Sequence, residues 1–306
     1  SSALGASHAA PGAGRTIGLM SELLPAAASV SEAWLLSLER TADVAGGRAV
    51  HVVSTVTEPG TEILSVRRVL DGALDGYGAQ SIDTVAETIF PASLYPDPAI
   101  DWAPDLPSAK RAMLDAAADA LYEAYVGMLP MLRTINANKS GTYFSRMITW
   151  PGKDAGGVNQ LALRIERLRS EYVAGRQTHN ALDIDTAADA QADEEDLRGV
   201  QVYAATDQRI RSFPCLTHID LTLYRGRLHM TAVYRHQYLI DKAYGNMLGL
   251  SWLMQFLCQQ TGHDLGELVV HATLADTQNR SRAVSLARDA RSAFDADAVV
   301  GSGTRP

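Results

Sequence analysis

The most constraining feature of the sequence is a pair of runs in which apolar and polar residues alternate, THIDLTLY and RLHMTAVY, separated by Arg225 and Gly226. This alternation places apolar side chains on one face of a strand, and a short turn with glycine joins two such strands into a hairpin. The segment MLGLSWLMQFLCQQ follows, is apolar nearly all round and ends before Gly262, as is typical of a buried helix. A hairpin and a central helix therefore define the core.

Upstream of this hairpin, helical and strand patterns alternate. Helices are predicted at residues 31–40 (with Ser31 as the cap), 81–95, 108–135 and 158–173, and strands at residues 49–57 and in the segment EILSVRRVL. Pro91 and Pro130 are expected to interrupt two of these helices. Strands interleaved with helices along one chain predict a mixed α/β fold of the α+β class.

The chain has 306 residues, of which 46% are hydrophobic, and this is enough for one large core. We expect residues 31–290 to form a single domain. Residues 1–30, which begin with a run of Ala, Gly and Ser, and residues 291–306 are expected to be poorly ordered tails. The acidic, alanine-rich segment at residues 177–197 is interpreted as a solvated insertion.

Composition excludes several classes of function. A net charge of −8 argues against general binding to nucleic acids or to an anionic membrane, since both need a positive surface field. No apolar run approaches the length of about 20 residues that spans a bilayer, and a cytoplasmic location is expected. Cys215 and Cys258 are too few for a disulfide framework or a four-thiolate zinc site. A small ligand or a protein partner is therefore expected, without a metal.

Cys215 has two interpretations, because free cysteine usually behaves as a small buried apolar residue. It follows Pro214 and precedes the hairpin, whose far end carries Arg235, so the hairpin would return a guanidinium close to the sulfur and lower the pKa of the thiol. Asn246 opens the buried helix and could read a polar ring edge. The alternatives are a surface ion pair for Arg235 and a helix cap for Asn246. Cys258, inside the apolar helix, is interpreted as core.

The residues from Pro214 to Val269 resemble the core of the thymidylate synthases: a Pro-Cys nucleophile, a hairpin with a glycine turn, an arginine, an asparagine, an apolar helix and then Gly-Glu-Leu-Val. The segment GTYFSRMITWPGKDAGGVNQLALRIERLRSE is similar to a second block of the family. SIDTVAETIFPASLY and SEAWLLSLER are similar to the segment with the catalytic glutamate and to the first helix. The resemblance covers most of residues 31–280 and is strong at 141–171 and 213–270.

This resemblance implies a large bent mixed β-sheet with flanking helices, and a homodimer packed sheet to sheet. It also implies a mechanism in which the thiolate of Cys215 adds to C6 of a pyrimidine and C5 attacks a one-carbon unit from 5,10-methylenetetrahydrofolate. Arg235 would bind the 5′-phosphate, and Asn246 would hold the base and favour uracil over cytosine. Glu87 would organise proton transfer, and Tyr143 would act near the ring and the sulfur. For Glu87 the alternative is a surface helix residue.

The sequence departs from the family where the folate and the sugar bind. Tyr238 replaces an aspartate that binds the pterin, and Asp276 and Gln278 replace a histidine and a tyrosine that bind the sugar 3′-hydroxyl. Leu216 replaces the histidine that usually follows the nucleophile. TEPGTEILS takes the place of the family's Arg-Thr-Gly phosphate loop. Use of the folate is therefore in doubt.

Four further residues complete the expected substrate site. The arginine pair that the other subunit supplies in the family has only single candidates here, Arg176 and Arg198. His236 and Tyr238, which follow Arg235, are grouped with the substrate-binding residues.

The sequence therefore predicts a divergent enzyme that methylates or hydroxymethylates C5 of a pyrimidine nucleotide or nucleoside. Two alternatives stay open. One is C5 chemistry without folate, such as exchange, decarboxylation or dehalogenation. The other is a degenerate homologue that binds nucleotides without catalysis.

Overall fold

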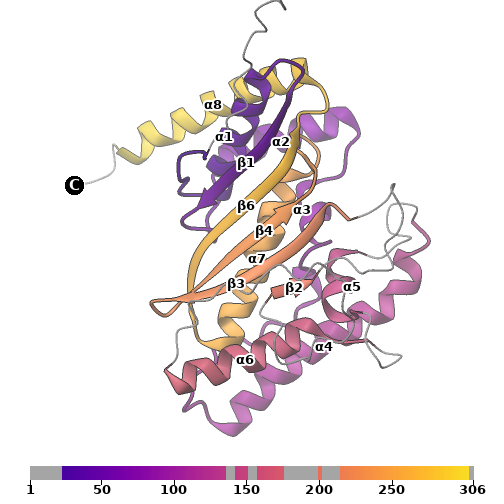
Figure 1. The fold of residues 1–306 in the computed structure, drawn as a ribbon, viewed down its shortest axis with the longest axis vertical. Coiled ribbons are helices and arrows are strands. Elements are labelled where there is room, and N and C mark those ends of the chain that lie inside the picture. Colours follow the sequence, from indigo (N-terminus) through magenta and orange to yellow (C-terminus); the bar gives the residue numbers. More distant parts are fainter. Residues whose placement is uncertain (1–22, 136–141, 151–156, 176–198, 202–213, 303–306) are drawn as a thin grey trace, which may run out of the picture.

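The computed structural model describes residues 23–135, 142–150, 157–175, 199–201 and 214–302 (Figure 1). Its helices are α1 (Val30–Asp43), α2 (Leu64–Tyr77), α3 (Ile82–Ala86), η1 (Ala92–Leu94), α4 (Ser108–Leu132), α5 (Tyr143–Ile148), α6 (Gln160–Ala174), α7 (Ala243–Thr261) and α8 (Arg280–Ser302). Its strands are β1 (Arg48–Val56), β2 (Gly199–Gln201), β3 (Leu216–Tyr224), β4 (Arg227–Tyr234), β5 (Gln237–Tyr238) and β6 (Asp264–Asp276).

The strands form one mixed sheet in the order β1-β6-β4-β3-β2, with β5 paired to β6. The pairs of β6 with β4 and with β5 are parallel, and the other pairs are antiparallel. The parallel pairing of β4 with β6 needs a crossover, which α7 provides. The mixed sheet with flanking helices confirms the α+β class.

Helix α7 lies behind the sheet and packs against α1, α3 and α6 as well as β4 and β6 (Figure 1). Fifteen of its residues are buried, which explains why its sequence is apolar on all sides. It ends at Gly262, whose φ of +76° is the left-handed conformation that glycine adopts without strain. The central buried helix is therefore confirmed, with its expected end.

The hairpin of β3 and β4 is also confirmed. Arg225 and Gly226 both have positive φ, as the two central residues of a tight hairpin turn require. Leu228, Met230 and Ala232 alternate toward the core, while the residues between them stay half-buried. The alternation in the sequence thus corresponds to the two faces of the sheet.

Three local predictions were wrong. EILSVRRVL belongs to helix α2, because Val66, Leu70 and Leu74 recur every four residues and bury one face, although β-branched residues favoured a strand. The cap of α1 is Ser29 rather than Ser31, which is buried. Pro130 lies inside α4, which continues to Leu132.

Both expected domain boundaries also shift. The chain joins the sheet before residue 31, because the N–H groups of Leu24 and Ala27 donate to carbonyls of β1. At the other end α8 continues through residue 302, well past residue 290. The acidic segment at 177–197, predicted to be a solvated insertion, lies outside the described residues.

Candidate functional site

Cys215 lies directly before β3, at the end of the sheet where β3 begins and β4 ends. The N–H of Arg235 donates to the carbonyl oxygen of Cys215 over 2.9 Å, and Nε of Arg235 donates to the carbonyl oxygen of Pro214 over 3.0 Å. The hairpin therefore returns Arg235 to the Pro-Cys pair, as the sequence predicts. Both contacts are to the backbone, so the cation is held beside the half-buried cysteine.

The thiol of Cys215 is subject to two opposing effects. Burial raises its pKa above the usual value, and the charge of Arg235 lowers it by less. Arg235 thus acts in the predicted direction, but the net pKa is raised because desolvation is the larger effect. In this state the sulfur is a thiol at neutral pH, and nucleophilic attack requires that a base remove its proton.

Tyr143 lies against the same sulfur. It is the first residue of α5, whose N-terminus is fixed by a capping box between Thr142 and Ser145. Burial, followed by the proximity of Cys215, raises the pKa of Tyr143 to about 12, although the backbone of Leu216 and Cys215 acts in the opposite direction. Tyr143 is therefore a neutral phenol beside the thiol of Cys215, able to donate or relay a proton.

Glu87 follows α3 and is held in place by Ser93. Its carboxylate accepts hydrogen bonds from the Ser93 N–H over 3.0 Å and from the Ser93 hydroxyl over 2.9 Å. The next residue, Thr88, accepts a backbone hydrogen bond of 3.0 Å from Phe144 of α5. Glu87 is therefore half-buried and anchored beside the segment that carries Tyr143, rather than free on a helix surface.

Asn246 lies in the first turn of α7 and is only 5% exposed. The residue that caps α7 is Lys242, so Asn246 does not serve as the cap. Among the described residues no hydrogen bond to its carboxamide is found, and its amide atoms are not among the fully buried, unpaired polar atoms. The carboxamide therefore keeps access to solvent, or to a ligand that both donates and accepts.

A second group of side chains lies toward the same end of the sheet, at the ends of β1, β5 and β6. Asp276 is 5% exposed; its Oδ2 accepts from Nε of Arg48 over 2.8 Å and lies 3.5 Å from Nε2 of His236. The rings of His236 and Tyr238 are 4.5 Å apart. The predicted residues His236, Tyr238 and Asp276 are therefore together, and they contact one another.

The charge of Asp276 is already neutralised within the protein. Burial alone would raise its pKa, but the N–H of Gln278 and the guanidinium of Arg48 outweigh burial and hold the pKa below its usual value. Both oxygens of this carboxylate already accept hydrogen bonds within the protein, so it has little capacity left to bind a sugar hydroxyl. Through Arg48, Asp276 joins β1 to β6.

The segment TEPGTEILS, which takes the place of the family's phosphate loop in the sequence, lies away from Cys215. It follows the end of β1 at Val56, which pairs with Leu268, whereas Cys215 lies near the level of Ala272. Five residues of strand from Val52 to this loop span about 17 Å. Gly60 lies beside Leu265 and Gln255 instead. This loop therefore does not form a phosphate site beside Cys215.

Two residues at the site were missed. Arg48 begins β1 and pairs with Asp276, and Tyr234, fully buried, lies close enough to Tyr143 and Cys215 for both to raise its pKa further after burial. Only the strand alternation could have indicated Tyr234. Arg176 and Arg198, the predicted phosphate arginines, lie outside the described residues.

A comparison with models of known protein families finds no match, and a comparison with curated protein sequences finds no significant relative. In the described part of the chain, no helix is both long and apolar enough to cross a membrane. Across the same residues, no three His, Cys, Asp or Glu side chains are grouped so that they could hold a metal ion.

Proposed function

We propose that this protein is a thymidylate-synthase-like enzyme that activates C5 of a pyrimidine by adding Cys215 to C6. The observation that supports this most directly is that Tyr143 and Arg235 both lie beside Cys215. Tyr143 comes 72 residues before Cys215 in the sequence, and Arg235 reaches it from the other end of the β3–β4 hairpin. A structural cysteine needs neither a guanidinium nor a phenol beside it. A nucleophile that must gain and lose a proton does.

The chemistry begins with loss of the thiol proton, which Tyr143 beside the sulfur would relay. Glu87 contacts Ser93 rather than Cys215, so it would take up this proton through intervening groups. The sulfur then forms a bond to C6, and the electron pair of the C5–C6 double bond moves onto C5 and the O4 carbonyl. C5 attacks a one-carbon electrophile. Loss of the C5 proton expels the sulfur from C6 and restores the double bond, so that the thiol is regenerated.

Asn246 supports recognition of the base. Its carboxamide offers one acceptor and two donors, and a uracil edge offers N3–H and O4 as complementary groups. Arg235 supports binding of an anionic group near the sulfur, since a guanidinium fork matches phosphate. Entry of such a ligand would expel water from the Asn246 carboxamide and replace it with hydrogen bonds to the base.

The residues do not fit a folate at the position that the family uses. The pterin would be held by a carboxylate where this chain has Tyr238, whose ring packs on His236, and the nearby Asp276 is engaged with Arg48. We therefore derive no step through methylenetetrahydrofolate. These contacts favour the second candidate, C5 chemistry without folate. In exchange or decarboxylation a proton replaces the proton or carboxyl group on C5, whereas in dehalogenation an external thiol must also take up the halogen as the reductant.

The decisive experiment is covalent trapping with a 5-fluoro-pyrimidine nucleotide, followed by intact-mass and peptide mapping. An adduct at Cys215 that is lost in Cys215→Ser and kept in Cys258→Ala supports the proposal. If the mass of the protein stays unchanged with every nucleotide tested, with or without methylenetetrahydrofolate, no adduct has formed and the result would contradict catalysis. Unchanged nucleotide affinity in Cys215→Ser would then indicate a binding protein.

Tritium release from a C5-labelled pyrimidine separates the two enzymatic candidates. Release without folate supports exchange chemistry. Release only when methylenetetrahydrofolate is present assigns the protein to the one-carbon transferases, despite Tyr238.

The proposed assembly is a homodimer packed through the sheet face that points away from α7. Val53, Val233 and Val269 lie on this face and are half-buried, as are the threonines between them. An apolar face of this kind is suited to burial against a second copy.

A further inference from the structure

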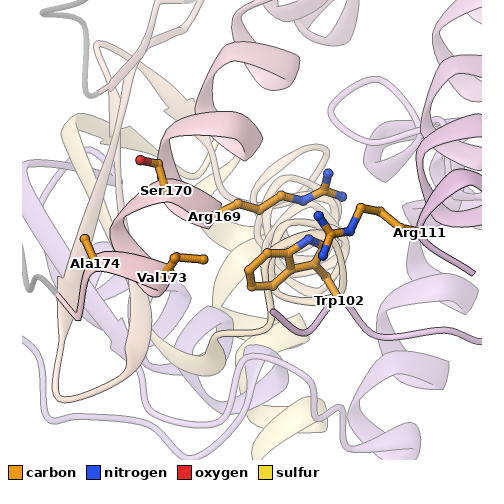
Figure 2. A pocket seen from close by; sticks show the side chains of 6 residues that line it. All are labelled: Trp102, Arg111, Arg169, Ser170, Val173 and Ala174. Atoms are coloured by element: carbon orange, nitrogen blue, oxygen red, sulfur yellow. The ribbon is translucent and has the colours of Figure 1, made fainter. Parts of the chain in front are cut away.

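A pocket of about 450 Å³ lies between α4, α6 and the loop before α4, away from the candidate site. Its lining consists of Trp102, Arg111, Arg169, Ser170, Val173 and Ala174 (Figure 2). Figure 2 shows two guanidinium groups that approach the indole of Trp102, Arg111 from α4 and Arg169 from α6, with Val173 pointing toward the same ring. Volumes of 300 to 1,000 Å³ are usual for small-ligand sites, so the pocket is large enough for one.

The floor of the pocket is rigid. Trp102 is 4% exposed, and its backbone N–H donates to the carbonyl oxygen of Gln259 over 2.9 Å. Its carbonyl oxygen would lie 2.5 Å from a Cβ at position 262, so glycine there allows the end of α7 to rest on the tryptophan. The indole is therefore held in place by the backbone on which it rests.

Arg169 forms a wall of the pocket, but its hydrogen-bonding capacity is used within the protein. Nε donates to the carbonyl oxygen of Gln260 over 2.7 Å, Nη2 donates to Oε1 of the same residue over 3.0 Å, and Nη1 binds Asp115 over 2.8 Å. Its charge is matched by that of Asp115. Arg169 therefore shapes the pocket and contributes little free charge.

Arg111 differs from Arg169 in this respect. A guanidinium has five N–H donors, and in the described residues only Nη2 of Arg111 has a partner, the carbonyl oxygen of Pro104 at 3.1 Å. Nε is buried without a hydrogen bond, and no carboxylate of the described residues lies within ion-pair distance. The guanidinium carbon is 6.0 Å from the centre of the Trp102 ring, which orients the fork. Arg111 thus presents an unneutralised positive charge at the pocket.

The opposite rim of the pocket is apolar and exposed. Val173, which lines the pocket, is 66% exposed. Tyr172 does not line the pocket, but its ring packs against Trp102 with the ring centroids 5.4 Å apart. The pocket therefore offers an apolar surface at Val173 and a guanidinium at Arg111. A small amphipathic acid needs these two contacts, one for its apolar body and one for its carboxylate.

We propose that this pocket binds a small organic monoanion, namely a carboxylate on a flat apolar body. The carboxylate would bind the free donors of Arg111, since one guanidinium charge matches one carboxylate and the two form parallel hydrogen bonds. The apolar body would cover Val173 and Ala174, which are exposed and line the pocket. A phosphate dianion would need a second free cation, and Arg169 is already paired.

The pocket is separate from the site at Cys215. Gln260, which holds Arg169, and Asn246 lie at opposite ends of α7, and fourteen residues of helix span about 21 Å. The inference therefore does not depend on the proposed chemistry, and its test uses binding alone.

The test is a ligand-observed NMR titration of the full chain with 1-naphthoate, with the neutral alcohol 1-naphthalenemethanol, inorganic phosphate and a hexaglutamate peptide as comparison probes. We expect 1-naphthoate to bind with a Kd of about 1 mM or tighter, and Arg111→Gln to weaken it about tenfold or more. Arg111→Lys should recover part of this loss, because it restores the charge without the fork.

Arg133→Gln, at the exposed C-terminal end of the same helix, is the matched control and should bind like the wild type. Arg111→Gln loses the hydrogen bond to Pro104 and the contact with the Trp102 ring, so its Tm should fall only slightly. The proposal is overturned if 1-naphthoate does not bind, if Arg111→Gln binds it normally, or if the alcohol binds equally well. Tighter binding of phosphate or hexaglutamate would assign the pocket to a phosphorylated ligand or to an acidic protein segment instead.

Discussion

The backbone N–H of Arg235 donates a 2.9 Å hydrogen bond to the carbonyl oxygen of Cys215. This contact closes the open end of the β3–β4 hairpin and sets the distance between the guanidinium and the thiol. Because it joins two backbone groups, it remains when either side chain is replaced. The electrostatic influence of Arg235 on the sulfur can therefore be removed without opening the hairpin.

Arg235→Gln should raise the pKa of Cys215 further, because it removes the charge that lowers this pKa and leaves the burial that raises it. A higher pKa means less thiolate at a given pH. We expect alkylation of Cys215 by iodoacetamide at pH 8 to slow about three- to tenfold, which corresponds to about half to one pKa unit. Rates are measured by peptide mapping, which separates Cys215 from Cys258.

Arg227→Gln, at the other end of β4, is the control for this measurement and should leave the rate unchanged. In every variant the rate should climb as pH rises through the pKa of the thiol. Faster alkylation of Arg235→Gln than of the wild type would show that Arg235 shields the sulfur rather than polarising it.

Asp276→Asn should lower the free energy of unfolding at pH 7 by about 1–2 kcal/mol, since it removes a charged acceptor for the Gln278 N–H and for Arg48. Solvent around Arg48, whose side chain is 68% exposed, keeps the loss small. The pKa of Asp276 is depressed in the folded state. Its stabilisation is therefore present above the unfolded pKa of about 3.9 and is lost as pH falls through the folded value.

Urea unfolding at pH 7 and near pH 3 checks this prediction for Asp276. The difference between wild type and variant should shrink at the lower pH. Asp241→Asn, on an exposed carboxylate that binds the Gln278 side chain, is the control and should have a smaller effect. An undiminished difference at low pH would mean that packing, rather than charge, accounts for the loss.

Gly249→Ala should destabilise the protein by about 1–3 kcal/mol through overpacking. A Cβ at this position would lie 2.6 Å from the carbonyl oxygen of Ala86 and 2.9 Å from Cβ of Ile89, so α3 must move. Ala86 precedes Glu87, and the displacement should also slow adduct formation at Cys215 if Glu87 takes part.

Gly127→Ala on α4 is the matched control, because nothing lies within 4 Å of its added Cβ and alanine favours a helix. It should be neutral or stabilise by up to about 1 kcal/mol. Thermal unfolding of both variants is the measurement. Similar Tm values for the two variants would argue against close packing of α3 on α7.

Asn246→Asp should change the base preference of adduct formation. If the proposed function holds, a carboxylate accepts from the amino group of cytosine but has no donor for the O4 of uracil. We expect the ratio of trapping rates for 5-fluoro-dUMP and 5-fluoro-dCMP to fall about tenfold or more. An unchanged ratio, with both adducts still formed, would remove Asn246 from the recognition of the base.

Val233→Asp should prevent dimer formation, because it places a charge on the sheet face proposed as the interface. Light scattering after size-exclusion chromatography measures the mass directly. Val284→Asp, on an exposed position of α8, is the control and should leave the mass unchanged. A wild-type protein that is monomeric at all concentrations would refute this assembly.

Patterns of local sequence predicted much of the secondary structure. The β3–β4 hairpin and α6 have strong periodicity, whereas α7 is apolar on all sides. Each has a glycine at its turn or its end, at Gly226, Gly175 and Gly262. The segment that became α2 was assigned wrongly, because its β-branched residues favour a strand while its burial follows a helical repeat. In such a segment the deciding factor is which neighbours bury it, and no local pattern carries that information.

At the site, the sequence by itself determined that Arg235 returns to Cys215, since a hairpin of known length brings its ends together. Only the tertiary structure decided that Arg48 meets Asp276, 228 residues later, because β1 and β6 are neighbours through the order of the sheet. Tertiary structure also decided the state of the thiol. Residue types show that a cation lies near Cys215, but the pKa depends on how much water the folded chain removes, and burial outweighs the charge.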